Sequence, residues 1–379
     1  MIFYFFVFFI LIISDIFHFK SKIYWYITFI ILGVFLCMGY MTGSDWRGYE
    51  IEYNEVLSKN IWEGNTEYGF LIYMYIFKYL GFDFWHFFIV TKWILFLIIF
   101  KFIDKNISDN KYFTYAIFFA LYGIFLFIDN PMRNLIGAVI YLFSFKYIVE
   151  ENFFKYLITC LLASLFHLSF LLFIPIFFLL NKKIKSKTYV IGFIFFNIIL
   201  FFFSDQIING VKLLEIFNIS YSIKLDQQIS GYIMSDNIKD APFSFGMLSR
   251  YIIFIILIMY RNLIESYSKN GRLIFNSSIF LIFLTRLVLI WPITLRLSIP
   301  FSVFYTLSLS IIILKSKKEI TFFLYSFLLL ISTGTIYTTI TSSIKYIPYS
   351  NYIEYLFVYK PDYNYRSNYN FDKSPYKNK

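Results

Sequence analysis

Long apolar runs without charge dominate the chain and restrict it to one class of fold. Several runs of 17 or more residues carry almost no charge, and a helix needs roughly 20 such residues to cross a bilayer core. Only 15% of the residues are charged and 59% are hydrophobic, against roughly 25% charged in ordinary soluble domains. The runs extend from Met1 to about Ile340 without a long polar block. These features exclude a soluble enzyme and predict an all-α, polytopic membrane protein.

A spanning helix satisfies its own backbone hydrogen bonds, so each long apolar run predicts a transmembrane helix. We place ten spans at 2–18, 23–41, 84–103, 112–128, 133–149, 188–204, 247–260, 273–291, 295–314 and 320–338. Residues 68–80 are too short to span and predict an interfacial or re-entrant helix. Residues 153–181 are basic at both ends, so they predict two shortened halves with a turn at His167. The whole is a bundle of about 10–12 spans with re-entrant or interfacial helices.

Lys and Arg in short loops set the orientation, because they mark the cytoplasmic side. Basic clusters follow the first span and recur near residues 101–111, 182–187, 261–272 and 315–318. Loop 42–67 has six acidic and two basic residues, and 205–240 has five acidic and three basic residues. Outer loops are therefore predicted at 42–67 and 205–246 of a membrane domain 1–340. The Lys-containing tail 341–379 follows, and its side stays open. The net charge of +11 reflects topology, and no nucleic-acid partner is implied.

Several charged residues fall at or near the outer helix ends of this topology. Such residues at membrane depth usually face a cavity or a partner and often mark function. Guanidinium groups bind phosphate bidentately, so several around one outer cavity would suit a lipid pyrophosphate. Interfacial anchoring is the alternative, above all for the arginines that begin helices. The set comprises Arg133, Arg250, Arg286 and Arg296, with Asp45 and Glu67 in the first outer loop.

Histidine and cysteine do not form a metal-binding pattern. Cys37 and Cys160 lie in apolar runs and are expected to be core residues. His167 has no acidic residue within a turn, and the chain lacks His-x-x-x-His, a P-loop and a Gly-x-Ser-x-Gly elbow. No metal and no cofactor is therefore expected. His167, with Ser169, is either functional at its turn or a satisfied buried imidazole.

The first outer loop places Asp45, Tyr49 and Tyr53 four residues apart. This spacing puts them on one face if a helix starts with Ser44 as its cap. Aromatic rings can stack on sugar rings, while a carboxylate binds hydroxyls or takes a proton. An amphipathic interfacial helix would have the same pattern, and both interpretations stay open.

These residues together resemble the EpsG family of Wzy-like exopolysaccharide and O-antigen polymerases. The resemblance is carried by four motifs in order: Gly-x-Asp-x-x-x-Tyr-x-x-x-Tyr at 43–53, Glu-x-Gly-Phe at 67–70, Arg133 at a helix start, and Leu-x-x-Leu-Phe-His-x-Ser at 162–169. The family usually has Gln after the arginine and Pro after the glutamate, where this chain has Asn134 and Tyr68. These departures bear on subgroup and sugar specificity.

The resemblance implies a metal-independent glycosyltransferase of GT-C-like architecture in the bacterial inner membrane. It would join lipid-linked oligosaccharide repeat units on undecaprenyl pyrophosphate into O-antigen, capsule or exopolysaccharide chains at the outer face. The leaving pyrophosphate needs cations and the acceptor hydroxyl needs a base. The implied catalytic residues are Asp45, His167, Arg133 and Arg296. The implied substrate-binding residues are Tyr49, Tyr53, Glu67, Arg250, Arg286 and Ser169.

The partners implied are the lipid-linked donor and acceptor and membrane lipids, with a chain-length regulator and a flippase. Two other classes remain open. A transporter or flippase for lipid-linked oligosaccharides could also use an arginine-lined cavity, although no inverted repeat is apparent. An O-antigen ligase or membrane acyltransferase would share the outer histidine and arginines.

Overall fold

The computed structural model describes residues 1–19, 21–58, 66–107, 109, 111–129, 131–216, 245–288 and 294–375. These residues form a nearly all-helical protein, as predicted, with one short ribbon of two strands. The chain divides into two compact units, which are described separately. Unit 1 comprises residues 1–174 and 309–379, and unit 2 comprises residues 175–308.

Five helical segments of the described chain are long and apolar enough to cross a membrane. They are α5 (Phe84–Asn106), α7 with α8 (Met132–Val149), Ser186–Phe203 of α11, Thr294–Lys315, and α18 (Lys318–Thr341). A bent pair, α13 (Phe245–Met259) with α14 (Arg261–Tyr267), would add a sixth. The prediction of a multi-pass membrane protein is confirmed at this level.

The remaining predicted spans coincide with shorter or irregular helical segments. These are α1 (Ile2–Ile16), α2 (Lys22–Cys37) and α15 (Gly271–Leu287). Span 112–128 coincides with α6 (Lys111–Phe118) and two wider π-helical segments, η2 (Phe119–Gly123) and η3 (Phe125–Asp129). Each of these segments is shorter, as a single α-helix, than the roughly 20 residues that cross a bilayer core. The larger count of 10–12 spans therefore stays a prediction.

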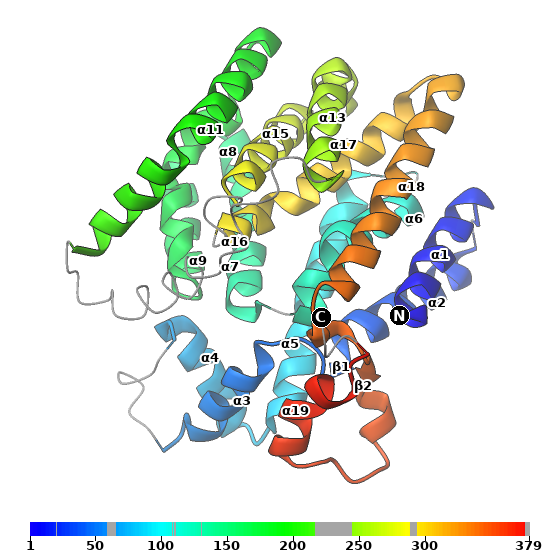
Figure 1. Cartoon of the computed structure of the whole chain (residues 1–379), viewed down its shortest axis with the longest axis vertical. Helices are drawn as coiled ribbons and strands as arrows, with labels where there is room; N and C mark the ends of the chain where they lie inside the picture. Colours follow the sequence, from blue (N-terminus) through cyan, green and yellow to red (C-terminus); the bar gives the residue numbers. More distant parts are fainter. Residues whose placement is uncertain are drawn as a thin grey trace. The chain divides into compact units, whose positions relative to one another are not determined.

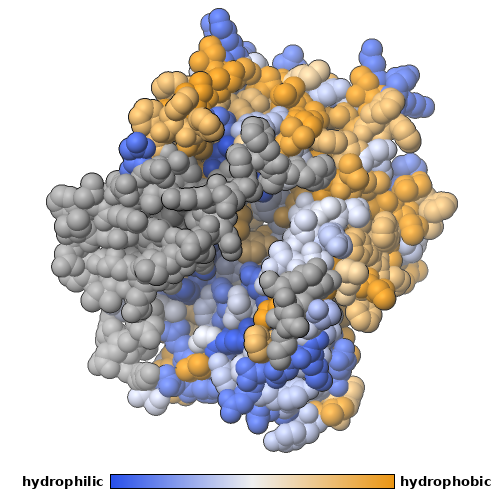
Figure 2. Space-filling model, in the orientation of Figure 1, coloured by the Kyte–Doolittle hydropathy of each residue, from blue (hydrophilic) through white to orange (hydrophobic). Residues whose placement is uncertain are grey.

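In unit 1, α1 packs beside α2, α6 and α18, while α5 packs against α2 and α7 (Figure 1). Phenylalanines fill these contacts, as in the Phe29–Phe96 pair between α2 and α5, with ring centroids 4.9 Å apart. The surface over α1 and α2 is hydrophobic, whereas the lower part of Figure 2 is mostly hydrophilic. That hydrophobic surface is the one a lipid-facing helix needs.

A polar layer covers one end of the helices of unit 1 (Figure 1). It contains α3 (Trp46–Glu55), α4 (Tyr68–Tyr79), α19 (Tyr363–Lys373), and the antiparallel ribbon of β1 (Gly39–Tyr40) and β2 (Ser350–Asn351). We call it the outer layer, since it carries the predicted outer loop 42–67. Residues 59–65, with Lys59 and Glu63, lie outside the described residues. The 12-residue helix α4 is separate from the candidate spans, as predicted for residues 68–80.

The C-terminal tail belongs to this outer layer. Arg366 forms two hydrogen bonds to the Glu50 carboxylate, at 2.6 and 2.8 Å, and both side chains are buried. The backbone N–H of Tyr352 donates to the Met38 carbonyl oxygen at 2.8 Å. The tail therefore lies at the same end of unit 1 as loop 42–67, and the outer side of both stays a prediction.

Residues 153–180 form two helical segments joined by a turn. Helix α9 (Phe153–Ser164) leads into a turn, and η4 (Leu168–Ile176) with α10 (Phe177–Leu180) leads away from it. The Gly69 N–H donates to the Leu165 carbonyl oxygen at 2.9 Å, so the turn contacts the start of α4. A turn at His167 between two helical segments is confirmed, and it lies at the end of unit 1 that carries the outer layer. That the two segments are shortened halves of a membrane hairpin stays a prediction.

Unit 2 is built from α10, α11 (Ser186–Ile216), α13, α14, α15, α16 (Thr294–Ser298), η6 (Ile299–Phe301) and the start of α17 (Ser302–Lys315). Helix α15 packs against α10, α11, α13, α14 and α16. The predicted outer loop 205–246 differs at its start, because the helical backbone of α11 continues to Ile216. Its residues 217–244 lie outside the described residues.

Candidate functional site

A tight turn holds the start of α3 against the end of η3 in unit 1. Gly43 has a φ angle of +84°, and a Cβ there would lie 2.0 Å from the Ile128 carbonyl oxygen. Only glycine fits such an approach at that backbone angle. The turn places the Ser44 hydroxyl 2.7 Å from Asp129 Oδ1 and 3.1 Å from Asp45 Oδ1. Ser44 thus bridges two carboxylates.

The predicted role of Ser44 as the cap of α3 is wrong. The helix begins at Trp46, with Asp45 in the cap position and no side-chain capping bond. The Ser44 hydroxyl instead points to the carboxylates of Asp129 and Asp45. Tertiary contact with η3 has outcompeted the local bond that a serine at a helix start usually makes.

Lys345 from the tail completes this carboxylate pair. Its Nζ lies 2.6 Å from Asp129 Oδ2, and its carbonyl oxygen accepts from the Gly43 N–H at 2.8 Å. The pKa of the neighbouring Tyr346 hydroxyl is raised by burial and further by the charges of Asp129 and Asp45. The charged groups around Ser44 therefore form one electrostatic cluster, the carboxylate cluster: Asp45, Asp129 and Lys345.

A second cluster lies where α7 (Met132–Leu142) begins, three residues after Asp129. Arg133 follows Pro131 at the helix start, as predicted, and its Nη1 donates to Glu67 Oε2. Its guanidinium also lies 5.9 Å from the centroid of the Tyr49 ring. Tyr49 is one turn after Asp45, so the start of α3 contributes to both clusters.

The turn after α9 brings His167 to the same place. The other oxygen of Glu67, Oε1, accepts from the Leu168 N–H at 3.4 Å. His167 Nδ1 lies 2.8 Å from Ser169 Oγ and accepts from the Ser169 N–H at 3.4 Å. An accepting Nδ1 leaves the proton of the neutral ring on Nε2. Gly69 permits this approach, because a Cβ there would lie 2.6 Å from the Leu165 carbonyl oxygen.

Four segments that are distant in sequence thus supply one group of side chains at one end of unit 1. Comparison of the chain with protein families agrees with the resemblance found in the sequence. The EpsG family model matches residues 22–352. The chain belongs to the EpsG family. Searches of curated proteins and of solved structures gave no significant match. EpsG membership and the apolar helices together indicate a multi-pass membrane protein with a polysaccharide-related role.

Tyr53 of this EpsG protein is more deeply enclosed than its predicted partners, since Tyr49 is 7% exposed and Asp45 is half-buried. Its ring is fully buried, stacks on Phe87 with centroids 4.9 Å apart, and its hydroxyl donates to the Phe82 carbonyl oxygen at 2.8 Å. Burial, with the nearby charge of Asp83, raises its pKa. The structure therefore gives Tyr53 a packing role, and its ring offers no open face to a sugar.

The three other predicted arginines belong to unit 2. Arg286 is buried, and its Nε donates to Asn197 Oδ1 at 2.7 Å. The Tyr251 hydroxyl donates to the same oxygen at 2.8 Å, and the Arg286 guanidinium lies 5.1 Å from the Tyr251 ring centroid. Arg250 is near enough to repel the charge of Arg286. Arg296 is half-buried on α16.

The convergence of all four arginines on one cavity stays a prediction, because Arg133 belongs to unit 1 and the others to unit 2. Three residues that contact the candidate site residues were not predicted from the sequence: Asp129, Lys345 and Asn197. Asp129 precedes Pro131 and Arg133, so its place before a helix start was an available signal. Nothing in the local pattern of Lys345 or Asn197 distinguishes them from other polar residues.

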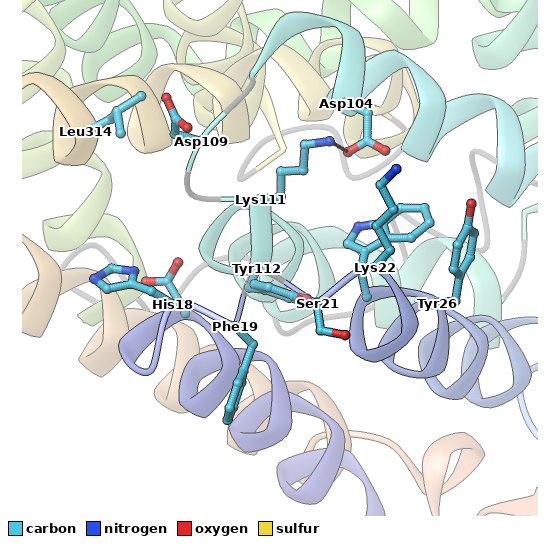
Figure 3. Close-up of a pocket in the computed structure, with 12 residues that line it drawn as sticks. His18, Phe19, Ser21, Lys22, Tyr26, Asp104, Asp109, Lys111, Tyr112 and Leu314 are labelled. Atoms are coloured by element: carbon cyan, nitrogen blue, oxygen red, sulfur yellow. Dashed lines mark ion pairs between the residues drawn. The ribbon is translucent and has the colours of Figure 1, made fainter.

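Among the described residues, no group of three or more His, Cys, Asp or Glu side chains is arranged to hold a metal ion. A separate cavity of about 830 Å³ lies at the opposite end of α5 (Figure 3). Lys111 and Asp104 form an ion pair of 3.4 Å in its wall. Asp15 accepts from the Phe113 N–H and the Tyr325 hydroxyl, at 3.3 and 3.0 Å. The carboxylates of Asp15 and Asp104 thus connect neighbouring helices. None of the predicted site residues lines this cavity.

Proposed function

We propose that this EpsG-family protein is a polysaccharide polymerase of the bacterial inner membrane. It joins oligosaccharide repeat units carried on undecaprenyl pyrophosphate into O-antigen, capsule or exopolysaccharide chains at the outer face. The fold proposed is a GT-C-like bundle of 10–12 spans. The observation that carries the proposal is the meeting of Arg133, Glu67, His167 and Asp45 from four separate segments at one end of unit 1.

The reaction joins an acceptor hydroxyl to the anomeric carbon of the donor sugar. The bond between that carbon and the pyrophosphate oxygen breaks, and the acceptor oxygen loses its proton. Asp45 is the proposed base, because it is only partly buried and lies at the start of α3. His167 is proposed as a hydrogen-bond donor through Nε2, because its Nδ1 already accepts from Ser169.

Arg133 is proposed to stabilise the negative charge on the leaving pyrophosphate. Glu67 fixes its Nη1, while its Nε is buried without a hydrogen-bond partner in the described part of the structure. The guanidinium therefore keeps a donor that a phosphate oxygen could use. Arg250, Arg286 and Arg296 of unit 2 are proposed as further anion-binding groups, with Tyr49 and Ser169 as substrate contacts.

The decisive experiment supplies purified protein in vesicles with lipid-linked repeat units in the absence of ATP. A polymerase lengthens the chains on the lipid carrier and releases undecaprenyl pyrophosphate. A transporter moves repeat units across the bilayer without lengthening them, and a ligase transfers single units only when a different acceptor is added. Either of those outcomes overturns the proposal.

A further inference from the structure

We infer that Lys345 is a positioning residue of the candidate site, holding Asp129 and, through Ser44, the base Asp45. The inference rests on the proposed function and adds the C-terminal tail to the site. Its starting point is the geometry of the carboxylate cluster. Ser44 Oγ lies within hydrogen-bond distance of both Asp129 Oδ1 and Asp45 Oδ1, at 2.7 and 3.1 Å.

Two carboxylates bridged by one hydroxyl repel each other, and a cation next to one of them offsets that repulsion. Asp129 is only 7% exposed, so solvent screens its charge poorly. The Lys345 ammonium lies on the opposite oxygen of Asp129, at 2.6 Å. It compensates one of the two negative charges that meet at Ser44.

The other charged and titratable groups around the carboxylate cluster do not form an ion pair with Asp129 in the described structure. Arg47 of α3 interacts with the Asp129 charge, but its guanidinium donates to the carbonyl oxygens of Gly43 and Ser367, at 2.6 to 3.0 Å. The Tyr346 hydroxyl faces both carboxylates, and burial together with their charges raises its pKa, so it stays neutral. Lys345 is therefore the cation that forms a direct ion pair with Asp129 in the described structure.

The tail makes a second lysine–aspartate pair that provides a matched control. Lys360 Nζ lies 3.4 Å from Asp83 Oδ2, on the same outer layer but with both side chains more exposed. Lys345→Met removes the charge from the carboxylate cluster, Lys345→Arg retains it, and Lys360→Met removes the control charge. All three are assayed for the rate of chain elongation across a pH range.

We expect Lys345→Met to slow elongation at pH 7 by about tenfold and to move the acid limb of the pH–rate profile upward by about one pH unit. Lys345→Arg should restore both the rate and the profile, and Lys360→Met should match the wild type. Wild-type behaviour of Lys345→Met overturns the inference. Equal loss in Lys345→Met and Lys345→Arg without a shifted profile also overturns it, because that result indicates a merely structural contact.

A readout independent of polymerisation separates this inference from the proposed function. Thr42 is 4% exposed, adjoins Gly43, and its hydroxyl is buried without a hydrogen-bond partner in the described structure, so Thr42→Cys is a mild reporter substitution. Its thiol should react several-fold faster when Lys345→Met is added, and at the original rate with Lys345→Arg or Lys360→Met. If the wild type forms no chains, the proposed function fails, and this labelling still decides the positioning role. Unchanged labelling of the Lys345→Met protein would then overturn it.

Discussion

The carboxylate of Glu67 pairs with the guanidinium of Arg133, 66 positions later in the chain, through Oε2. Its second oxygen accepts from the backbone N–H of Leu168 at 3.4 Å. One side chain thus connects the start of α7 to the turn that carries His167. A half-buried carboxylate with two such partners orients both, because leaving either donor unpaired would carry a desolvation penalty.

The first prediction concerns the shape of the Arg133 side chain. Arg133→Lys keeps the charge but loses the planar fork of donors that fits phosphate. We expect the elongation rate to fall by about 100-fold, the order of loss seen for one transition-state donor, with a normal protein level in the membrane. Chain length on gels and the initial rate in vesicles measure the effect.

Arg261→Lys is the control for that substitution. Arg261 is buried and, like Arg133, pairs with a glutamate, since its Nε lies 2.8 Å from Glu265 Oε1. Its guanidinium also donates to the Ile184 carbonyl oxygen, and neither partner is a predicted site residue. It should leave elongation within about twofold of the wild type. Equal losses in the two variants would assign Arg133 an anchoring role only.

The second prediction concerns the charge of Asp45. Asp45→Asn preserves the size of the side chain while removing its basicity, so elongation should be abolished and lipid-linked single repeat units should accumulate. Asp45 makes no side-chain capping bond, so the loss cannot come from a weakened helix start. Mass spectrometry of the lipid-linked products measures the accumulation. An active Asp45→Asn protein would remove Asp45 as the base and leave His167 as the candidate.

The third prediction concerns topology. Leu168 is 48% exposed at the hairpin turn and Tyr359 is 91% exposed in the tail. Cysteines at both positions should react with an impermeant thiol reagent applied outside the cell, because both segments lie at the end of unit 1 that carries the outer layer. Both native cysteines, Cys37 and Cys160, are buried, so their background labelling should be low.

Lys105→Cys is the opposite-side control, because Lys105 is exposed at the far end of α5. It should react only after the membrane is permeabilised. Labelling of Leu168→Cys and Lys105→Cys from the same side would contradict the hairpin topology.

The fourth prediction concerns the buried pair of Arg366 and Glu50. Removing one partner of a buried ion pair commonly costs about 3–5 kcal/mol, because the other charge stays buried without compensation. Arg366→Ala should therefore release α19 from α3 and make the tail sensitive to protease, with a lower Tm in detergent. Lys373→Ala, a change to an exposed lysine on the same helix, is the control. Equal protease resistance of both variants would show that other contacts hold the tail.

Much of the membrane architecture follows from the sequence alone. Each predicted span coincides with a helical segment, because an uncharged run in lipid must satisfy its own backbone hydrogen bonds. The hairpin at 153–180 follows from the basic residues at both of its ends. The sequence alone also identified Arg133, Glu67 and His167 as candidate site residues. Polar groups at membrane depth are costly, so they are conspicuous in an apolar sequence.

Tertiary structure decided which residues complete the site and which only pack. The mutual approach of Gly43 and Ile128 directs Ser44 to Asp129, and the folded tail adds Lys345 from more than 200 positions away. Tyr53 shares its helix face with Asp45 and Tyr49 but is enclosed by Phe87 and Phe82. Apolar periodicity and charge are local properties that sequence records directly. Contacts between distant segments depend on the close packing of the whole unit, which no local pattern specifies.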